Sequence, residues 1–383
     1  MEFGFSAEDE GFRGEVRQWL AEHAPGAAGR RDWERTLGKD GWVGIGWGEA
    51  GFGNRTASLT QQVVWAEEYA RSVAPPRSGH IGENLLAPTL LAHGTAEQKA
   101  RFLPAIAEGR ELWCQGYSEP AAGSDLAGIR TKAERGPDGT YRISGQKIWT
   151  SLAHEADWCF VLARTEPGST RHRGLSFLLV PMDQPGRVEV RPIRQMTGTS
   201  DFNEVFFDGA SARAEHVVGD PGGGWQVAMS LLGFERGVST LAQQIGFAAE
   251  LGRIVEAAVK SGAVADPVVR ERLVRQWAEL RAMRWNALRT LGSSGDAGAP
   301  SVAKLLWAGW HQRLGELAME VRGAAAAVGP ADWSPSAPYE LDALQHLFLF
   351  SRADTIYGGS DQVQRTIIAE RVLGLPREPK GVA

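Results

Sequence analysis

The sequence predicts an α+β protein with three parts, an N-terminal helical domain, a middle antiparallel β domain and a C-terminal four-helix bundle. Helical periodicity dominates up to about residue 108, and short apolar or alternating runs separated by turn residues follow from Trp113 to Asp208. Helical periodicity then returns after Pro221. This order fits neither a doubly wound sheet nor a barrel of alternating strands and helices. We place the domains at residues 1–110, 111–220 and 221–383.

An amphipathic helix is predicted over residues 6–23. Its apolar residues recur at helical spacing, at Phe12, Val16, Trp19 and Leu20. Ser6 stands where an N-cap residue is expected. A second helix start is predicted from the capping box Thr95-Ala-Glu-Gln98.

The strands of the middle domain are predicted from short apolar runs bounded by turn residues. These runs are Tyr141–Ile143, Trp158–Leu162, Leu175–Val180 and Val205–Phe207, and Pro137-Asp-Gly139 is a turn signal between two strands. Four long helices are predicted in the last domain, near 225–260, 266–291, 300–323 and 339–373. Gly292–Pro300 is predicted to be a loop between helices, and Ala324–Ala327 to mark a helix end or close helix packing.

Composition is that of an ordinary globular protein, with 23% charged and 43% apolar residues. Lys and Arg total 41 against 46 for Asp and Glu, so a net charge of −5 provides no basic field for nucleic acid. The only cysteines, Cys114 and Cys159, are too few for a disulfide framework and lack metal-ligand spacing, so we expect a reducing compartment and no metal. The acidic start has no signal-peptide pattern, and no apolar run approaches the ~18 residues of a membrane span. We expect a cytoplasmic protein without a membrane partner.

Two short motif matches are predicted to be coincidental. Gly46-Trp-Gly48-Glu-Ala-Gly51 has the glycine spacing of a dinucleotide-binding turn, but a helical segment follows and reaches Pro75-Pro76 without a second strand. His154-Glu155 begins like a zinc-protease motif, but Trp158 stands where the second histidine is required. The sequence also has no Gly-x-Ser-x-Gly elbow, which leaves a serine hydrolase unsupported.

The segment Cys114-Gln-Gly-Tyr-Ser-Glu-Pro-Ala-Ala-Gly-Ser-Asp125 is a compact polar loop between an apolar strand and the β region. Its backbone N–H groups, hydroxyls and glycine allow a bulky anionic ligand to approach closely, although a plain structural loop has the same composition. The loop resembles the acyl-CoA dehydrogenase signature Thr/Ser-Glu-Pro-x-x-Gly-Ser-Asp. Gly145–Ser151 is similar to the second flavin segment of that family, and Ile356–Arg365 to its C-terminal signature. With the order of domains, the resemblance covers essentially the whole chain.

This resemblance implies an oxidoreductase acting on CH–CH bonds with FAD as its cofactor. The loop residues that match flavin contacts are Tyr117 and Ser118, for the isoalloxazine, and Gly123 and Ser124, for the pyrophosphate. Trp149 would flank the flavin ring, with a purely packing role as the alternative, and Ser151 would bond to the polar edge of the ring. Ser360 and Gln362 match positions that contact the ADP part of FAD.

The base of the family reaction is missing from its commonest position. A carboxylate must remove the α-proton of the acyl thioester while a hydride leaves the β-carbon. In most members this glutamate follows the tyrosine of the C-terminal signature, but here Gly358 follows Tyr357. In the isovaleryl and long-chain branches the base lies on the first helix after the β domain, and Glu235 aligns with it. Arg236 matches an arginine that helps to hold the substrate or the base, and the alternative for Glu235 is a surface carboxylate.

Tyr357, Gly358 and Gly359 are expected to line the acyl group. Gly358 keeps the backbone N–H that holds the thioester oxygen in the family, and its missing side chain leaves room for a branched, cyclic or bulky acyl group. The resemblance also implies an acyl thioester substrate on CoA or a carrier protein, electron-transfer flavoprotein as acceptor, and a homo-oligomer (dimer or tetramer) or a heteromer.

Two other functions stay open. The pattern Tyr-Gly-Gly-Ser at Tyr357–Ser360 is similar to large subunits of heteromeric acyl-CoA dehydrogenases, so the chain is alternatively a non-catalytic or half-site subunit. Oxygen-using oxidases and monooxygenases share the same fold and loop, and oxygen consumption would distinguish them.

Overall fold

The computed structural model describes residues 5–26, 28–49, 51–234, 239–290, 298–329 and 341–377. The chain forms two compact units. The sheet unit comprises Phe5–Arg194 and Ser200–Gly237, and the bundle unit comprises Met1–Gly4, Gln195–Thr199 and Val238–Ala383.

The helices of the sheet unit begin where the sequence offers capping residues. Ser6 and Thr95 each close a capping box, which confirms both predicted helix starts, and Ser58 closes a third. The helices are α1 Ala7–His23, α2 Arg30–Lys39, α3 Leu59–Arg71, α4 Ala87–His93, α5 Ala96–Ala107 and α6 Gly224–Phe234. A π-helical turn, η2 Gly82–Leu86, runs directly into α4.

Buried tryptophans hold the first three helices and the segment between α2 and α3 together. Trp19, Trp33, Trp42 and Trp65 form the centre of one hydrophobic cluster. The rings of Trp42 and Trp65 stack with centroids 4.5 Å apart. The described residues of Gly46–Gly51 lie in turns and bends, and α3 begins only at Leu59, so these glycines do not stand at a helix start.

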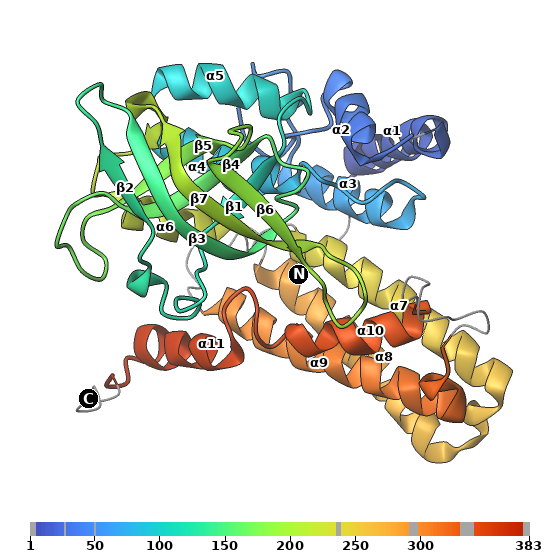
Figure 1. Ribbon diagram of the computed structural model, residues 1–383. Helices are drawn as coiled ribbons and strands as arrows, with labels where there is room; N and C mark the ends of the chain where they lie inside the picture. Colours follow the sequence, from blue (N-terminus) through green and yellow to red (C-terminus); the bar gives the residue numbers. More distant parts are fainter. Residues whose placement is uncertain are drawn as a thin grey trace. The chain divides into compact units, whose positions relative to one another are not determined.

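Within the described chain, eight strands form one twisted sheet, mostly green in Figure 1, in the order β6, β7, β3, β2, β4, β5, β8, with β1 also paired to β4. The strands are β1 Trp113–Gly116, β2 Lys132–Arg135, β3 Tyr141–Ser151, β4 Trp158–Arg164, β5 Leu175–Pro181, β6 Val188–Ile193, β7 Phe202–Ala212 and β8 Val217–Val218. All four predicted runs lie in strands, and the Pro137–Gly139 turn joins β2 to β3. The sheet is not wholly antiparallel as predicted, because β1 runs parallel to β4 and β2 meets β4 in parallel at one residue pair.

Strand β4 is buried on both faces. Phe160 and Leu162 contribute to a core with residues of α4, α5 and α6, whereas Cys159 and Val161 contribute to a second core among the strands. The sequences of strands that are buried on both faces are continuous apolar runs rather than alternating apolar and polar residues. This double burial explains why Trp158–Leu162 is apolar throughout.

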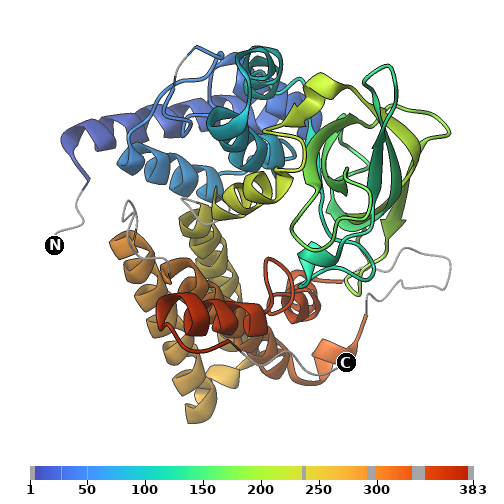
Figure 2. The same cartoon turned by 90° about the vertical axis from the view of Figure 1, so that its left-hand side faces the viewer.

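Among the described residues of the bundle unit, three long helices lie side by side in both ribbon views (Figures 1 and 2). The α-helices of the unit are α7 Ser239–Ser261, α8 Pro267–Thr290, α9 Ala299–Arg322, α10 Ala343–Phe350 and α11 Asp361–Ile367. Short helical turns are η5 Ala263–Ala265, η6 Gly323–Ala327, η7 Ser351–Ala353 and η8 Ile368–Val372. The turn η6 ends α9, which confirms the predicted helix end at the alanine run; most of the predicted loop at Gly292–Pro300 lies outside the described residues.

One of the four predicted long helices is wrong in extent. The described residues of the stretch near 225–260 form α6 and α7, and the residues that join these two helices lie outside the described part of the chain. The stretch near 339–373 contains α10 and α11, and the backbone between them turns at Gly358 (φ +62°) and Gly359 (φ +84°). Positive φ values are incompatible with a continuing right-handed helix, so apolar periodicity across this glycine pair does not produce one.

We predict that Gly224→Ala destabilises the sheet unit by about 2–3 kcal/mol, because a Cβ at this position would lie 2.4 Å from the backbone carbon of Ser176 in β5. Gly233→Ala is the matched control on the same helix, where a Cβ would meet no atom within 4 Å. The free energy of unfolding of the control variant should rise by about 0.5–1 kcal/mol, because alanine has a higher helix propensity than glycine. Urea unfolding measures both, and equal stabilities of the two variants would contradict the close approach of α6 to β5.

Candidate functional site

A buried ion pair fixes the signature loop to the sheet. Lys147 of β3 is fully buried, and its ammonium donates hydrogen bonds to Glu119 Oε1 at 2.9 Å, to the Tyr117 carbonyl at 3.1 Å and to the Leu162 carbonyl at 2.9 Å. All three ammonium donors are therefore used. One side chain thus ties together the loop, β3 and β4.

The carboxylate of Glu119 also accepts hydrogen bonds from the backbone. The Arg130 N–H donates to Glu119 Oε2 at 2.6 Å, and the Thr131 N–H donates to Oε1 at 2.9 Å. Burial by itself would raise the pKa of Glu119, but the Lys147 ammonium and the hydrogen bonds outweigh it and hold this pKa below its usual value. Burial lowers the pKa of Lys147. The sequence did not predict the ion pair of Glu119 and Lys147. Its two residues lie in the motifs Cys114–Asp125 and Gly145–Ser151, and this was the only indication of a role.

Beyond the ion pair, the loop opens towards solvent. The Glu119 and Ala122 backbones exchange two hydrogen bonds that close a tight turn. Gly123 and Ser124 follow on the exposed side, and a Cβ at Gly123 would meet no atom within 4 Å. The turn therefore presents its glycine, a hydroxyl and backbone groups to open space, as a phosphate-binding turn requires.

Trp149 projects from an irregularity in β3. The pairing of β3 with β7 shifts register between Lys147 and Thr150, and Trp149 has φ +60° although it is not glycine. Its ring is 57% exposed and meets Phe202 edge-on, with centroids 6.3 Å apart. A large residue in the left-handed region costs of order 1–3 kcal/mol, and such strain and bulges cluster at functional sites. Trp149 is therefore not a core residue of the sheet unit.

The structure brings several predicted residues together within the sheet unit. The Ile148 N–H donates to the Ser118 carbonyl at 3.0 Å, which places the loop beside Trp149. Half-buried Ser151 lies two residues further along β3. The ring of Tyr117 is 5% exposed and packs edge-on against Phe160 and Phe177, so this ring belongs mainly to the core.

In the bundle unit, the glycine turn is held by a glutamine. The amide of buried Gln364 donates to the carbonyls of Gly358 at 3.3 Å and Gly359 at 3.2 Å. A Cβ at Gly359 would lie 2.4 Å from this amide nitrogen, whereas the nearest atom to a Cβ at Gly358 is Lys304 Nζ at 3.9 Å. A Cβ at Gly358 would thus meet no backbone atom within 4 Å, and its N–H makes no hydrogen bond to another backbone group of the described residues. Gln364 was missed, although it lies within the C-terminal signature.

Tyr357 is anchored by a buried acid. The Tyr357 hydroxyl donates to Asp354 Oδ1 at 2.6 Å, and His311 lies between Asp354 Oδ2 (2.5 Å from Nδ1) and Glu250 Oε2 (2.9 Å from Nε2). Burial by itself would lower the pKa of His311, but the two carboxylates raise this pKa to about 9. Burial, followed by the charge of Asp354, raises the pKa of Tyr357. No sequence motif marks these partners, because they come from three separate helical segments.

The remaining predicted residues have simpler environments. The Ser360 hydroxyl caps α11 by accepting the Val363 N–H, and Gln362 is exposed in the first turn of that helix. Glu235 and Arg236 lie outside the described residues. Among the described residues no cluster of three metal-ligating side chains occurs, and no helix in that part of the chain is long and apolar enough to cross a membrane.

The residues of the sheet unit fit a flavin. A planar ring needs an apolar face to lie against, and the exposed ring of Trp149 supplies one beside the Ser118 backbone. A pyrophosphate needs close access to backbone N–H groups, and the open glycine turn at Gly123 and Ser124 supplies it.

Family models match nearly the whole chain. The models for the N-terminal, middle and C-terminal domains of acyl-CoA dehydrogenase match residues 6–110, 114–210 and 222–373. Acyl-CoA dehydrogenase IpdE1 of Mycobacterium tuberculosis is 54% identical over 97% of this chain and 99% of its own length. The IpdE1 protein of Mycolicibacterium smegmatis is 53% identical over 97% of this chain and 98% of its own. The chain belongs to the acyl-CoA dehydrogenase family.

Solved structures agree with this assignment. The ChsE4-ChsE5 complex from Mycobacterium tuberculosis contains a chain with a TM-score of 0.82 and 30% identity, covering 99% of this chain and 100% of that one. The structure of the Tcur3481-Tcur3483 steroid ACAD has a TM-score of 0.83 and 28% identity, with 99% and 100% covered. The chain is thus an acyl-CoA dehydrogenase, an oxidoreductase that acts on CH–CH bonds with a flavin cofactor.

We predict that Lys147→Met destabilises the protein by about 3–5 kcal/mol, because Glu119 keeps its buried charge and loses its partner. Lys132→Met on neighbouring β2, where the ion pair with Glu134 is exposed, should cost less than about 1 kcal/mol. The double variant Lys147→Met/Glu119→Gln should recover part of the loss. Urea unfolding measures all three, and a double variant no more stable than Lys147→Met would contradict the proposed coupling.

We predict that the stability of the protein carries a contribution from His311 that is lost as pH rises. The folded-state pKa of about 9 lies above the ordinary 6.5, so this contribution is full below about pH 6.5 and disappears as pH passes through 9. Its size is on the order of 3 kcal/mol. Urea unfolding across this range should show a steeper fall for the parent than for His311→Gln; identical pH profiles would contradict the double ion pair.

Proposed function

We propose that this enzyme uses FAD to remove two hydrogens from the α- and β-carbons of an acyl thioester, acyl-CoA or carrier-bound, giving the trans-2-enoyl thioester. The observation that carries the proposal is the exposed side chain of Trp149, on a strained backbone position, beside the open turn at Gly123 and Ser124. FAD, when bound, supplies the acceptor for the β-hydride. The protein supplies binding, orientation and a base.

The cofactor would be held by the residues that match the flavin positions of the family. The edge of the isoalloxazine would contact the backbone of Tyr117 and Ser118 and the side chain of Ser151. The ring of Trp149 would lie against the face of the isoalloxazine. The turn at Gly123–Ser124 would bind the pyrophosphate. Exposed Gln362 and half-buried Ser360, at the start of α11, would contact the ADP part.

Glu235 would take the α-proton. Gly358 has no acid to offer, but its backbone N–H remains free of the amide of Gln364, which holds only the carbonyl side of the turn. This N–H would hold the thioester oxygen as negative charge develops there, acidifying the α-carbon. Arg236 would orient the substrate or Glu235, and Tyr357 and Gly359 would line the acyl group.

The acyl group would be branched, cyclic or otherwise bulky, because the position beside Gly358 is open. One similar solved structure is named a steroid ACAD, and steroid-derived thioesters are bulky in this sense. We propose a cytoplasmic protein whose electrons pass to an electron-transfer flavoprotein. It would act as a homo-oligomer or, by analogy with the ChsE4-ChsE5 complex, as a heteromer with a related subunit.

We predict that Glu235→Gln lowers the rate of anaerobic flavin bleaching by acyl-CoA by at least about a thousandfold while FAD absorbance is retained, because the amide cannot accept the α-proton. Glu256→Gln on exposed α7 surface is the matched control and should react at the parental rate. The measurement uses FAD-loaded enzyme, with any copurifying subunit, and a panel of acyl-CoA thioesters.

Three other results would speak against the proposal. Unchanged bleaching in Glu235→Gln would remove the base assignment. A parent that binds FAD but reacts with no thioester would favour the non-catalytic subunit. Rapid oxygen consumption by the reduced enzyme would favour an oxidase.

A further inference from the structure

Gly358 and Gly359 form a turn in which two consecutive residues lie in the left-handed region, at φ +62° and +84°. Glycine has the greatest backbone freedom of any residue, so a turn made of two glycines has little tendency to keep one direction by itself. The N–H of Gly358 makes no hydrogen bond to another backbone group of the described residues. The direction of this N–H therefore depends on the contacts that hold the residues on either side of it.

On the C-terminal side, the turn is held by the side chain of Gln364 in α11. The amide of Gln364 donates hydrogen bonds to the carbonyls of Gly358 at 3.3 Å and Gly359 at 3.2 Å. This approach requires glycine at position 359, because a Cβ there would lie 2.4 Å from the amide nitrogen. A single side chain thus fixes the two peptide groups that follow the N–H of Gly358.

The environment of Gln364 is unusual for a glutamine that only stabilises the fold. The residue is 1% exposed, and its Oε1 has no hydrogen-bond partner among the described residues. A buried polar atom without a partner is costly. The two carbonyls that the amide holds belong to an exposed and a half-buried glycine, where water can replace a lost donor. The net contribution of Gln364 to stability is therefore small, and its place in the structure calls for another explanation.

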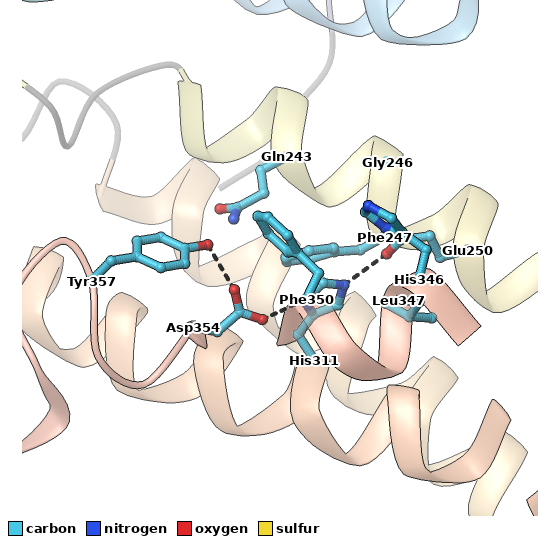
Figure 3. A pocket seen from close by; sticks show the side chains of 10 residues that line it. All are labelled: Gln243, Gly246, Phe247, Glu250, His311, His346, Leu347, Phe350, Asp354 and Tyr357. Carbon is cyan, nitrogen blue, oxygen red and sulfur yellow. Dashed lines mark hydrogen bonds and ion pairs between the residues drawn. The ribbon is translucent and has the colours of Figure 1, made fainter. Parts of the chain in front are cut away.

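On the N-terminal side, the turn is held through Tyr357. Figure 3 shows Asp354 between the Tyr357 hydroxyl, 2.6 Å from Oδ1, and His311, whose Nδ1 is 2.5 Å from Oδ2. The Tyr357 N–H donates to the Ala353 carbonyl at 3.1 Å. Tyr357, Asp354, His311 and Glu250 line a pocket of about 340 Å³, of which the tyrosine ring is one wall. The residue before Gly358 is thus fixed by both its side chain and its backbone.

The planar peptide group of Tyr357 and Gly358 lies between these two held segments. Its direction depends on ψ of Tyr357 and φ of Gly358, and neither angle can change alone while both neighbours are fixed. The N–H is therefore held in one direction before any ligand binds. A donor that needs no reorientation stabilises a developing negative charge most effectively.

Resting on the proposed function, we infer that Gln364 is a positioning residue, which holds the glycine turn so that the N–H of Gly358 points at the thioester oxygen. Gln364 acts through the backbone of the turn and is not itself a catalytic residue. Asp354 has the corresponding role on the other side, through Tyr357.

Gln364→Leu tests the inference, because leucine removes the donor and leaves no polar atom buried. Gln364→Met is a second variant that keeps an unbranched side chain. Gln345→Leu is the matched control. Gln345 in α10 is also buried, and its amide also donates to two carbonyls, those of Ala326 and Val328, both at 3.0 Å and neither in the glycine turn.

The probe is cyclohexylthioacetyl-CoA, in which sulfur replaces the β-carbon. This thioester can lose its α-proton to the base, which leaves the electron pair of the C–H bond on the enolate oxygen, but it has no β-hydrogen to transfer as hydride. The enolate beside oxidised FAD is measured by its long-wavelength charge-transfer absorbance. The pH at half-maximal absorbance reports how strongly the protein stabilises the negative charge on the thioester oxygen.

With FAD-loaded enzyme and any copurifying subunit, both Gln364 variants should lower the equilibrium constant for loss of the α-proton at least about tenfold, which raises the midpoint by about one pH unit or more. The Kd of the protonated probe should stay within about threefold. The rate of anaerobic bleaching by the best thioester should fall at least about tenfold. Gln345→Leu should be less stable in urea than the parent and should keep the parental midpoint and bleaching rate.

Other results would overturn the inference. Parental midpoints and bleaching rates in both Gln364 variants would show that the amide does not position the N–H. An equal shift in Gln345→Leu, or loss of folding in both Gln364 variants, would show a general structural role. In each of these cases the parent still bleaches and the proposed function stands. A parent that bleaches with no thioester would instead fail the proposed function, and the inference with it.

Discussion

The sheet unit depends on the fully buried ammonium of Lys147. An unpaired charge at this depth costs several kcal/mol, so it persists only because one carboxylate and two carbonyls occupy its three donors. Glu119 also accepts hydrogen bonds from the backbone N–H groups of Arg130 and Thr131, in the segment that follows the loop. The pair therefore positions the loop as well as neutralising itself. The next residues of β3 leave the regular ladder, and the ring of Trp149 is directed outward beside a loop that cannot shift.

In the bundle unit, the buried charged group that fixes its neighbours is Asp354. This acid is fully buried and fixes His311, Tyr357 and, through its carbonyl, Lys304. Its position one turn before the glycine pair means that the wall of the pocket and the turn are set by the same group. A Cβ at Gly358 would meet only Lys304 Nζ, at 3.9 Å, so the anchor does not require a side chain at this position.

In both units, a buried charged side chain with hydrogen-bond partners lies close in sequence to a residue with positive φ. Trp149 and the Gly358–Gly359 pair have positive φ, and each lies next to a segment held by several hydrogen bonds to a single side chain. Strained conformations persist when their surroundings over-determine them. Each segment is therefore held firmly within its own unit.

The sequence by itself determined the fold class, the helix starts at Ser6 and Thr95, and the runs that became β4 and β5, because capping and apolar periodicity are local properties. It also placed Trp149 and Gly358 in motifs that marked them for function. Only the tertiary structure decided that β1 runs parallel to β4 and that the last predicted helix breaks at the glycine pair. It alone brought Lys147 to Glu119 and His311 to Asp354. Those pairs join residues 28 and 43 positions apart, and no local pattern encodes a contact that exists only once separate elements have packed.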